Sequence, residues 1–316
     1  MDPIGWLANG VNTLQRAIFE GLVQPVLFAA GGMRYAEELY DLTEWIVLGA
    51  IEVALLWLVL GAIERRWPAE PVTDPRAVRT DVVYTLLHRL GGFTLLMFAL
   101  LTPAMDGLES ELRLLGFSRL NVDQLWPGVT DLALVSFAIY LVLFDFVDYW
   151  VHRLQHRWHG WWALHAVHHS QRQMTLWSDN RNHLLDDLLR DAVMALVAVA
   201  IGVGPGQFVV LLIATRMMQS LQHANLRLRY PGPLERWLVS PSFHRLHHAI
   251  GFGHEGAARG VNFAVLFPIW DRLFGTADFR PGFVPTGIRD QLDGRDYGRG
   301  FWSQQWRAFG RWFGRA

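Results

Sequence analysis

The chain of 316 residues contains no cysteine and no lysine. Without cysteine it has no disulfide, Cys-ligated zinc site, iron–sulfur cluster or thiol nucleophile. Without lysine it has neither a Schiff-base lysine nor a P-loop lysine. Charged side chains make up only 18% of the residues and the formal net charge is −1, whereas ordinary soluble domains are roughly 25% charged. A near-neutral chain is a poor nucleic-acid binder, so we expect no nucleic-acid partner.

Long apolar runs accompany this shortage of charge, and hydrophobic residues make up 52% of the chain. A membrane-spanning helix needs about 20 apolar residues, which predicts spans over residues 45–63, 82–105 and 128–150. Buried helices of a soluble protein are the alternative, but so many apolar runs are hard to cover otherwise. Glu52 lies inside the first run, where an acid is either functional or hydrogen-bonded within the bundle.

A fourth apolar region, 184–222, is interrupted by glycine and proline at 202–206, which predicts a helical hairpin. His183 precedes Gly202 by 19 residues and His223 follows Pro205 by 18. Because a helix rises about 1.5 Å per residue, the two histidines return to the same level and are expected near one site. The predicted fold is therefore an all-α, integral-membrane bundle of about four spans, including this hairpin.

The distribution of arginine between the loops predicts how the chain is oriented in the membrane. The loop after the first span holds four arginines, Arg65, Arg66, Arg76 and Arg79, whereas the loop after the second holds only Arg113 and Arg119. The positive-inside rule then places the first loop, and the histidine-rich cap that follows the third span, in the cytoplasm. Absence of lysine fits the codon bias of a GC-rich bacterial genome, so we expect a bacterial inner membrane.

Four segments organise the chain. Residues 1–42 form an amphipathic N-terminal segment with a helix over 5–30, which lies in the membrane interface or packs as an ordinary helix. Residues 43–129 hold the first two spans, and 130–280 hold the third span, the hairpin and most histidines. Residues 281–316 end in a tail in which Trp and Phe alternate with Arg, as in an interfacial anchor.

Three histidine clusters carry the chemistry. Their spacings are His152-x3-His156, His165-x2-His168-His169 and His244-x2-His247-His248. Positions i, i+3 and i+4 share one face of a helix, so each cluster points its imidazoles at one place. Neutral imidazole is the commonest protein metal ligand, and the number of histidines favours two ions. Nitrogen ligands favour Fe, Zn or Cu over Mg or Ca.

Other patterns are excluded or left open. The pair His254-Glu255 is followed by Gly-Ala, so there is no HExxH motif of a zinc protease. Asp148 stands one turn before His152, where it either accepts a hydrogen bond from that ligand or pairs with Arg153 or Arg157. Three further histidines lie outside the clusters, and their roles stay open: His88, His159 and His254.

The three clusters resemble the histidine boxes of the fatty acid hydroxylase / sterol desaturase superfamily. Their flanks resemble it too, in Asp148-Tyr-Trp-Val-His152, Ser240-Pro-Ser-Phe-His244 and Trp270-Asp271-Arg-Leu-Phe-Gly275-Thr276. His183 and His223, the latter within Gln222-His223-Ala-Asn225, match two further family histidines. With these two histidines, the predicted metal ligands are His152, His156, His165, His168, His169, His183, His223, His244, His247 and His248.

The resemblance implies a membrane-bound, non-haem di-iron oxygenase that uses O2 to hydroxylate or desaturate a lipid C–H bond. We predict two iron ions, a lipid substrate from the bilayer, and Asp148 and Asn225 as the catalytic residues. Electrons are expected from a separate ferredoxin- or cytochrome-type reductase, because no haem-binding segment, flavin fingerprint or cysteine cluster occurs. Within the superfamily, an alkylglycerol monooxygenase or a carotenoid oxygenase is an alternative. Outside it, a metal transporter is the distant alternative.

Overall fold

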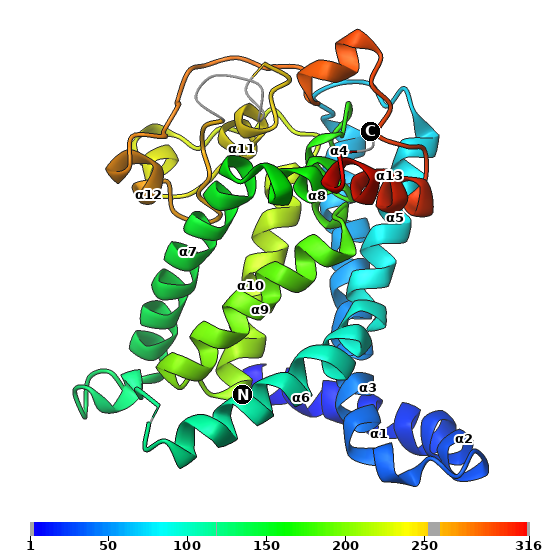
Figure 1. Ribbon diagram of the computed structural model, residues 1–316, viewed down its shortest axis with the longest axis vertical. Coiled ribbons are helices and arrows are strands. Elements are labelled where there is room, and N and C mark those ends of the chain that lie inside the picture. Colours follow the sequence, from blue (N-terminus) through cyan, green and yellow to red (C-terminus); the bar gives the residue numbers. More distant parts are fainter. Residues whose placement is uncertain (1–2, 118, 252–259, 315–316) are drawn as a thin grey trace.

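A computed structural model describes residues 3–117, 119–251 and 260–314. Over these ranges the regular structure is helical, apart from one isolated β-bridge between Ala249 and Thr286. The all-α prediction is therefore confirmed. Long helices run between two ends of the molecule, and a cap of short helices and loops closes one of them (Figure 1).

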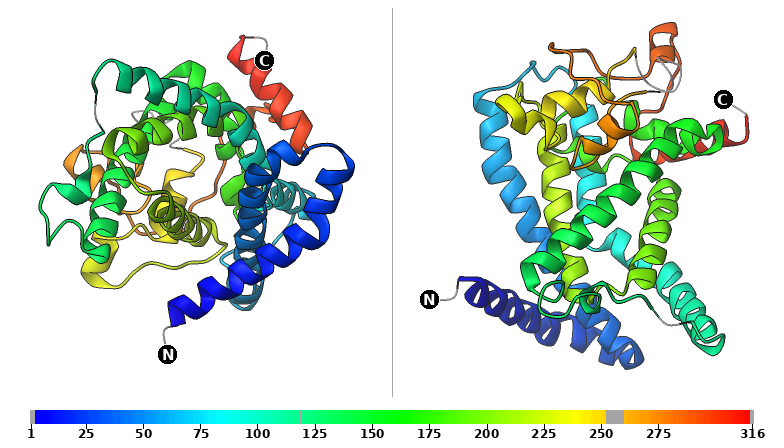
Figure 2. Two further views of the ribbon diagram at one scale, coloured as in Figure 1. Left: turned by 90° about the horizontal axis from the view of Figure 1, so that it is seen from below. Right: turned by 90° about the vertical axis from the view of Figure 1, so that its left-hand side faces the viewer.

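An N-terminal arm lies across the end opposite to the cap (Figures 1 and 2). It consists of α1 (Pro3–Ile18), a π-helical turn (Phe19–Val23) and α2 (Gln24–Ala29). The arm is held to the next helix by the hydrogen bond from Gln15 Nε2 to the Tyr40 carbonyl at 3.0 Å. Leu22, Val26 and Phe28 are exposed on it, as expected of an amphipathic segment.

Two helices are long and apolar enough to cross a membrane, Met33–Arg66 and Ala133–Arg157. The first contains a 3-10 turn (Met33–Tyr35), α3 (Ala36–Leu55), a π-helical turn (Leu56–Leu60) and α4 (Gly61–Arg66). The second is α7. They correspond to the first and third predicted spans.

The prediction of one span over 82–105 is wrong. The chain forms α5 (Pro75–Arg89) and α6 (Gly92–Leu114), separated by Leu90 and Gly91. Gly91 adopts φ +85°, and a Cβ there would lie 2.9 Å from Ile46 Cγ1 on α3. The positive φ and the close packing both require glycine, and α6 leaves the break in a new direction (Figure 1).

The predicted hairpin is confirmed as α9 (Leu184–Ile201) and α10 (Pro205–His223). Gly202 ends α9 in the left-handed conformation, with φ +69°. Side chains of the hairpin pack on α7, where Leu211 joins the buried cluster of Val122, Tyr140 and Phe144. Before α7, the chain forms a 3-10 turn at Val122–Gln124.

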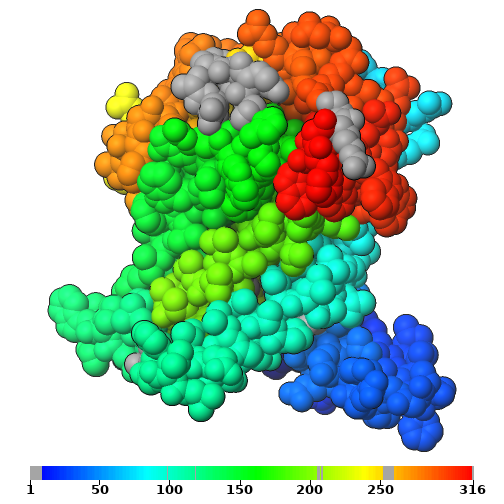
Figure 3. All heavy atoms as spheres, in the orientation of Figure 1, coloured from blue at the N-terminus to red at the C-terminus, as the bar shows by residue number. Residues whose placement is uncertain are grey.

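The cap contains the remaining helices: α8 (His159–His169), α11 (Pro241–His247), α12 (Ile269–Leu273) and α13 (Phe301–Trp312). Three 3-10 turns connect them, at Ser178–Asn180, Gly232–Arg236 and Arg289–Asp293. The loop after the first long helix reaches the same end, because Ala69 N donates to the Asn225 carbonyl at 2.9 Å. α13 lies beside α8 on the surface (Figure 3) and exposes Trp302 and Trp306.

Candidate metal centre

Two groups of four buried histidines lie where α7, α8, α10 and α11 meet. In each group the ligating nitrogens lie within 4.8 Å of one another. The first histidine set is His152, His156, His169 and His247, and the second histidine set is His168, His223, His244 and His248. All three sequence clusters contribute to the sets, and the hairpin adds His223.

The nitrogens approach one another as ligands of one ion would. In the first set, Nε2 of His169 lies 3.1 Å from Nε2 of His156 and 3.2 Å from Nε2 of His247. In the second set, Nε2 of His223 lies 3.2 Å from Nε2 of His168 and 3.0 Å from Nε2 of His244. Metal–nitrogen bonds of about 2.0–2.1 Å place neighbouring ligand nitrogens about 3.0–3.4 Å apart. Both sets fit a first-row metal ion.

The opposite ring nitrogens of three histidines contact backbone carbonyls. Nδ1 of His152 lies 2.8 Å from the carbonyl oxygen of Phe263. Nδ1 of His247 lies 2.7 Å from that of Val261, and Nδ1 of His223 lies 2.8 Å from that of Gln219. A carbonyl only accepts, so Nδ1 carries the proton and Nε2 presents its lone pair to the set. This is the tautomer that binds a metal.

Burial keeps these histidines neutral. It lowers the pKa of His168, His169, His244 and His248 well below the ordinary value, and that of His247 to about 3. Neutral imidazole is the ligand form, so the sets are ready for a cation at neutral pH.

His165 stands between the two sets without belonging to either. Its ring centroid lies 5.0 Å from that of His169 and 5.4 Å from that of His168. Its Nδ1 lies 2.9 Å from Asp186 Oδ2, and its buried Nε2 has no hydrogen-bond partner within the described residues. Asp186 also accepts from Gln155 and Trp161, at 2.6 and 2.7 Å. We did not predict Asp186, although its position at the start of a hairpin that ends in a ligand was a usable signal.

His183 lies outside both sets. Its Nδ1 accepts from Leu185 N at 3.1 Å and so caps α9, while its Nε2 lies 3.2 Å from the Gln305 carbonyl. Although it shares the cap end with His223, it faces the C-terminal helix, where its ring packs on Phe309 at 4.6 Å. This placement does not support the expectation that His183 is a ligand.

Asp148 does not accept a hydrogen bond from His152, nor does it pair with Arg153 or Arg157. It forms a bidentate ion pair with Arg190 of α9, with Nε–Oδ1 at 2.8 Å and Nη2–Oδ2 at 2.5 Å. The expectation failed because the Phe263 carbonyl already takes the His152 proton.

Asn225 holds the loop after the first long helix. Its side chain accepts from Glu70 N at 3.1 Å and donates to the Glu70 carbonyl at 2.8 Å. It therefore supports the cap beside the second histidine set, two residues from His223.

Two further acids hold the segment that carries the Phe263 carbonyl. Asp271 accepts from Phe263 N and Ala264 N, both at 2.8 Å. Asp145 accepts from Leu266 N at 2.7 Å and from the Trp270 indole at 2.8 Å. Burial raises the pKa of Asp271 to about 6. The sequence pattern Trp-Asp-Arg-Leu-Phe-Gly-Thr marks this support.

The remaining polar residues have structural partners. Glu52 pairs with Arg89, which also donates to Asp179 at 3.1 Å, so Glu52 is an acid bonded inside the bundle. His88 Nε2 lies 2.8 Å from Asp187 Oδ2. His159 is exposed at the start of α8, and His254 lies outside the described residues.

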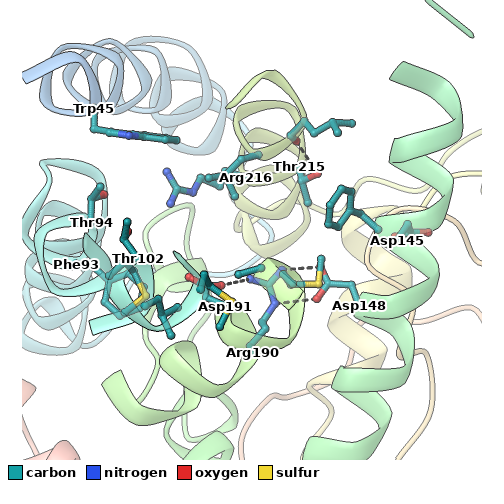
Figure 4. Close-up of a pocket in the computed structure, with 18 of the residues that line it drawn as sticks. Trp45, Phe93, Thr94, Thr102, Asp145, Asp148, Arg190, Asp191, Thr215 and Arg216 are labelled. Atoms are coloured by element: carbon teal, nitrogen blue, oxygen red, sulfur yellow. Dashed lines mark hydrogen bonds and ion pairs between the residues drawn. The ribbon is translucent and has the colours of Figure 1, made fainter. Parts of the chain in front are cut away.

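Two cavities that share lining residues lie on this side of the site, and the smaller one adjoins the histidines. The larger, about 320 Å³, is lined mostly by apolar side chains of α6, α7, α9 and α10. The smaller, about 90 Å³, is lined by histidines of both sets and by carboxylate and amide side chains. Asp148 and Arg190 line both, and their ion pair is visible at the edge of the larger cavity in Figure 4.

The fold and site define a helical, histidine-rich protein with two candidate metal sites and a largely apolar cavity near them. Residues 137–276 match the model of the fatty acid hydroxylase family. This match and the relatives below confirm the resemblance to the fatty acid hydroxylase / sterol desaturase superfamily: residues 137–276 form a fatty acid hydroxylase domain, and the relatives are oxidoreductases.

Three relatives illustrate the similarity. The ornithine lipid hydroxylase of Rhizobium tropici is 28% identical over 78% of this chain and 71% of its own length. Human alkylglycerol monooxygenase is 32% identical over 47% of this chain, and methylsterol monooxygenase 1-1 of Arabidopsis thaliana is 27% identical over 48%. This chain spans 32% of the length of the human protein and 49% of the length of the Arabidopsis protein. No solved structure matches the chain.

Proposed function

We propose that the protein is a membrane-embedded di-iron oxygenase that hydroxylates a C–H bond of a membrane lipid. The observation that carries this function is the pair of four-histidine sets beside an apolar cavity. Eight neutral nitrogen ligands are the donor set for two first-row ions, and we assign iron because it activates O2 and is the metal that the family resemblance implies. Desaturation is the alternative outcome, because it begins with the same hydrogen abstraction.

Overall, one oxygen atom of O2 enters the C–H bond and the other leaves as water, with two electrons and two protons consumed. Bound iron would supply the activation of O2 and the attack on the C–H bond. The chain contributes the eight histidines that hold the ions and the carbonyls of Phe263, Val261 and Gln219 that orient them. The apolar walls of the larger cavity shelter the hydrocarbon part of the lipid from water.

We extend the proposal to the surroundings. The two electrons come from a separate ferredoxin- or cytochrome-type donor on the cytoplasmic side. The long helices lie in a bacterial inner membrane with the histidine end in the cytoplasm. Residues 1–42 and 281–316 lie at the two membrane interfaces, around spans in 43–129 and a hydroxylase-like domain at 130–280. Exposed Trp302 and Trp306 on α13 support the second interface.

The substrate proposal draws on the names of the relatives. One is an ornithine lipid hydroxylase and another an alkylglycerol monooxygenase. The greater coverage of the former favours a polar membrane lipid as substrate, and an ether lipid is the alternative.

Comparative lipidomics under ¹⁸O2, together with metal analysis of the purified protein, tests the function. We expect two irons per chain and a cellular lipid that gains one ¹⁸O atom only when the chain is present. A His168→Ala/His169→Ala control should abolish both. Two irons with a lipid that loses two hydrogens would indicate desaturation. Weakly held, exchangeable metal without any lipid change would contradict the enzyme and favour metal transport.

A further inference from the structure

The larger cavity is apolar, but no histidine lines it within the described residues. The histidines instead line the smaller cavity, among them His152, His168 and His223. A hydrocarbon chain that fills the larger cavity therefore does not by itself bring a carbon to the metal ligands. The reacting part of the substrate has to enter the polar cavity.

The boundary between the two cavities is the Asp148–Arg190 ion pair, since these two residues line both. A methylene chain that displaced this pair would separate the buried Asp148 carboxylate from the half-buried Arg190 guanidinium and offer no hydrogen bonds in return, which is unfavourable. A polar head can instead exchange hydrogen bonds with the pair and with Gln155, Asn182 and Gln222 of the smaller cavity. The boundary thus favours a polar group over hydrocarbon.

Arg216 of α10 adds a charge requirement. Its side chain lines the larger cavity, and its guanidinium makes no direct hydrogen bond or ion pair with a described residue, although Glu52, Asp191 and Asp179 act on it at longer range. Two other arginines of this region are neutralised, Arg190 by Asp148 and Arg89 by Glu52. Figure 4 shows Arg216 reaching into the cavity toward Trp45, whose ring centroid lies 5.9 Å from the guanidinium carbon, with no interaction drawn to an acid. Because no acid bonds to it directly, the N–H donors of its guanidinium are available to an anionic group of the ligand.

Arg216 also sets a distance. It precedes His223, a member of the second histidine set, by seven residues on the same helix. At about 1.5 Å per residue the two lie about 10 Å apart along α10. An anionic group bound at Arg216 would therefore hold the neighbouring carbons of the lipid close to the histidines. The tails of the lipid would fill the larger cavity.

We propose that the substrate is an anionic lipid that binds head first: Arg216 holds its anionic group, the tails occupy the larger cavity, and the oxidised carbon belongs to the polar head or adjoins it. This inference rests on the proposed function, because it names the substrate class of the same site. It assigns Arg216 as a specificity-determining residue and the Asp148–Arg190 pair as the boundary that rejects bare hydrocarbon.

Binding to metal-free protein tests the anion site without turnover. Dioleoyl phosphatidic acid and diolein share their tails and differ by a phosphate, and oleate and oleyl alcohol differ by a carboxylate. We expect the protein in detergent to bind at least one anionic member at least tenfold more tightly than its neutral partner. A preference within the first pair would indicate a phosphate ligand, and a preference within the second pair would indicate a carboxylate ligand.

Arg216→Met should abolish that preference, and Arg216→Lys should retain part of it. Arg113→Met is the matched control, since Arg113 is exposed on α6 and pairs with Glu109; it should bind like the wild type. Because Arg216 has no ion-pair partner to lose, Arg216→Met should leave the Tm unchanged or raise it, so that lost binding cannot be ascribed to unfolding. Equal binding of both members in both pairs would overturn the proposal.

Tandem mass spectrometry of the cellular product tests the orientation. We expect the added oxygen in the head-group fragment or on the carbon that adjoins it. Oxygen on a remote acyl methylene would overturn head-first binding while leaving the proposed function intact. The failure of the function itself is distinguishable, because it would give neither iron nor oxidised lipid.

Discussion

The imidazole of His165 and the carboxylate of Asp186 form a buried pair in which Nδ1 lies 2.9 Å from Oδ2. The other carboxylate oxygen accepts from Gln155 of α7 and Trp161 of α8. One acid at the start of α9 thus fixes the two helices that carry the first two histidine clusters. The pair sits beside both histidine sets and positions an imidazole whose Nε2 faces no protein partner in the described chain.

Replacing Asp186 should therefore weaken metal binding. Asp186 joins α7 to α8, which carry ligands of both sets, and loss of a group that holds metal ligands in place typically costs 10–100-fold in affinity or activity. We expect Asp186→Ala to show a loss of about this size in iron affinity, and Asp186→Asn a smaller one because its amide oxygen still accepts. Competition with a chelator measures it. Asp293→Ala, at an exposed position, is the control, and wild-type affinity in Asp186→Ala would refute the role.

His168 and His169 are neighbours in sequence but belong to different sets. His168→Ala and His169→Ala should therefore each lower the metal content from two ions to about one per chain and abolish activity, whereas the double variant should hold none. Inductively coupled plasma mass spectrometry counts the ions. If either single variant lost both ions, or kept full activity, the assignment of two separate four-histidine sites would fail.

His183 should behave differently from His223. We expect His183→Ala to keep both ions and to lower stability by about 0.5–2 kcal/mol, as for a lost helix cap, because it caps α9 and contacts Gln305. His223→Ala should lose the ion of the second set. Metal content and thermal unfolding of the two variants decide between these roles; loss of iron in His183→Ala would restore it as a ligand.

The histidine pattern predicted much of the site because it is local. Spacings of three and four place imidazoles on one helix face whatever the tertiary fold, and the Gly–Pro interruption at 202–206 marks the hairpin directly. Seven of the eight histidines in the two sets come from the three clusters and the eighth, His223, from the hairpin end.

The histidine pattern could not predict interaction partners that are distant in the sequence. Spacing on α7 offered Asp148 only neighbours on its own helix, whereas its partner Arg190 lies 42 residues away. The acceptor for His152 is a backbone carbonyl, which no side-chain pattern encodes. The break at Gly91 was missed because apolar composition alone does not distinguish one straight span from two helices packed at an angle.

Asp271 supports the first histidine set from a distance. It accepts from two backbone N–H groups, and Phe263, which it holds, accepts the proton of His152. Removing the acceptor leaves buried donors unsatisfied at about 1–3 kcal/mol each. We expect Asp271→Ala to lower the free energy of unfolding by about 2–5 kcal/mol and to weaken metal binding at the first set more than at the second. Thermal unfolding and iron titration measure both, and an unchanged Tm would contradict this support.

The absence of cysteine from the chain makes its orientation directly testable. Leu115 follows α6 and is 72% exposed, and Leu292 precedes α13 and is 62% exposed. The end of α6 and the segment before α13 lie at opposite ends of the molecule (Figure 1). Four arginines lie in and around the loop at the histidine end, Arg65, Arg66, Arg76 and Arg79, and cytoplasmic loops carry such an excess. In spheroplasts, a membrane-impermeant maleimide should therefore label Leu115→Cys from outside, and Leu292→Cys only after permeabilisation.

The unsubstituted chain should take no label, and both variants should react fully in detergent, which controls for accessibility. The reverse pattern would place the histidine end outside and remove the cytoplasmic electron donor from the proposal. Labelling of both variants from the same side would contradict a membrane between the two ends, since Met33–Arg66 and Ala133–Arg157 run toward the cap across that interval. Labelling of Leu115→Cys from outside and of Leu292→Cys from inside would support the proposed orientation. In that orientation the histidine sets face a cytoplasmic reductant and the larger cavity lies within the bilayer.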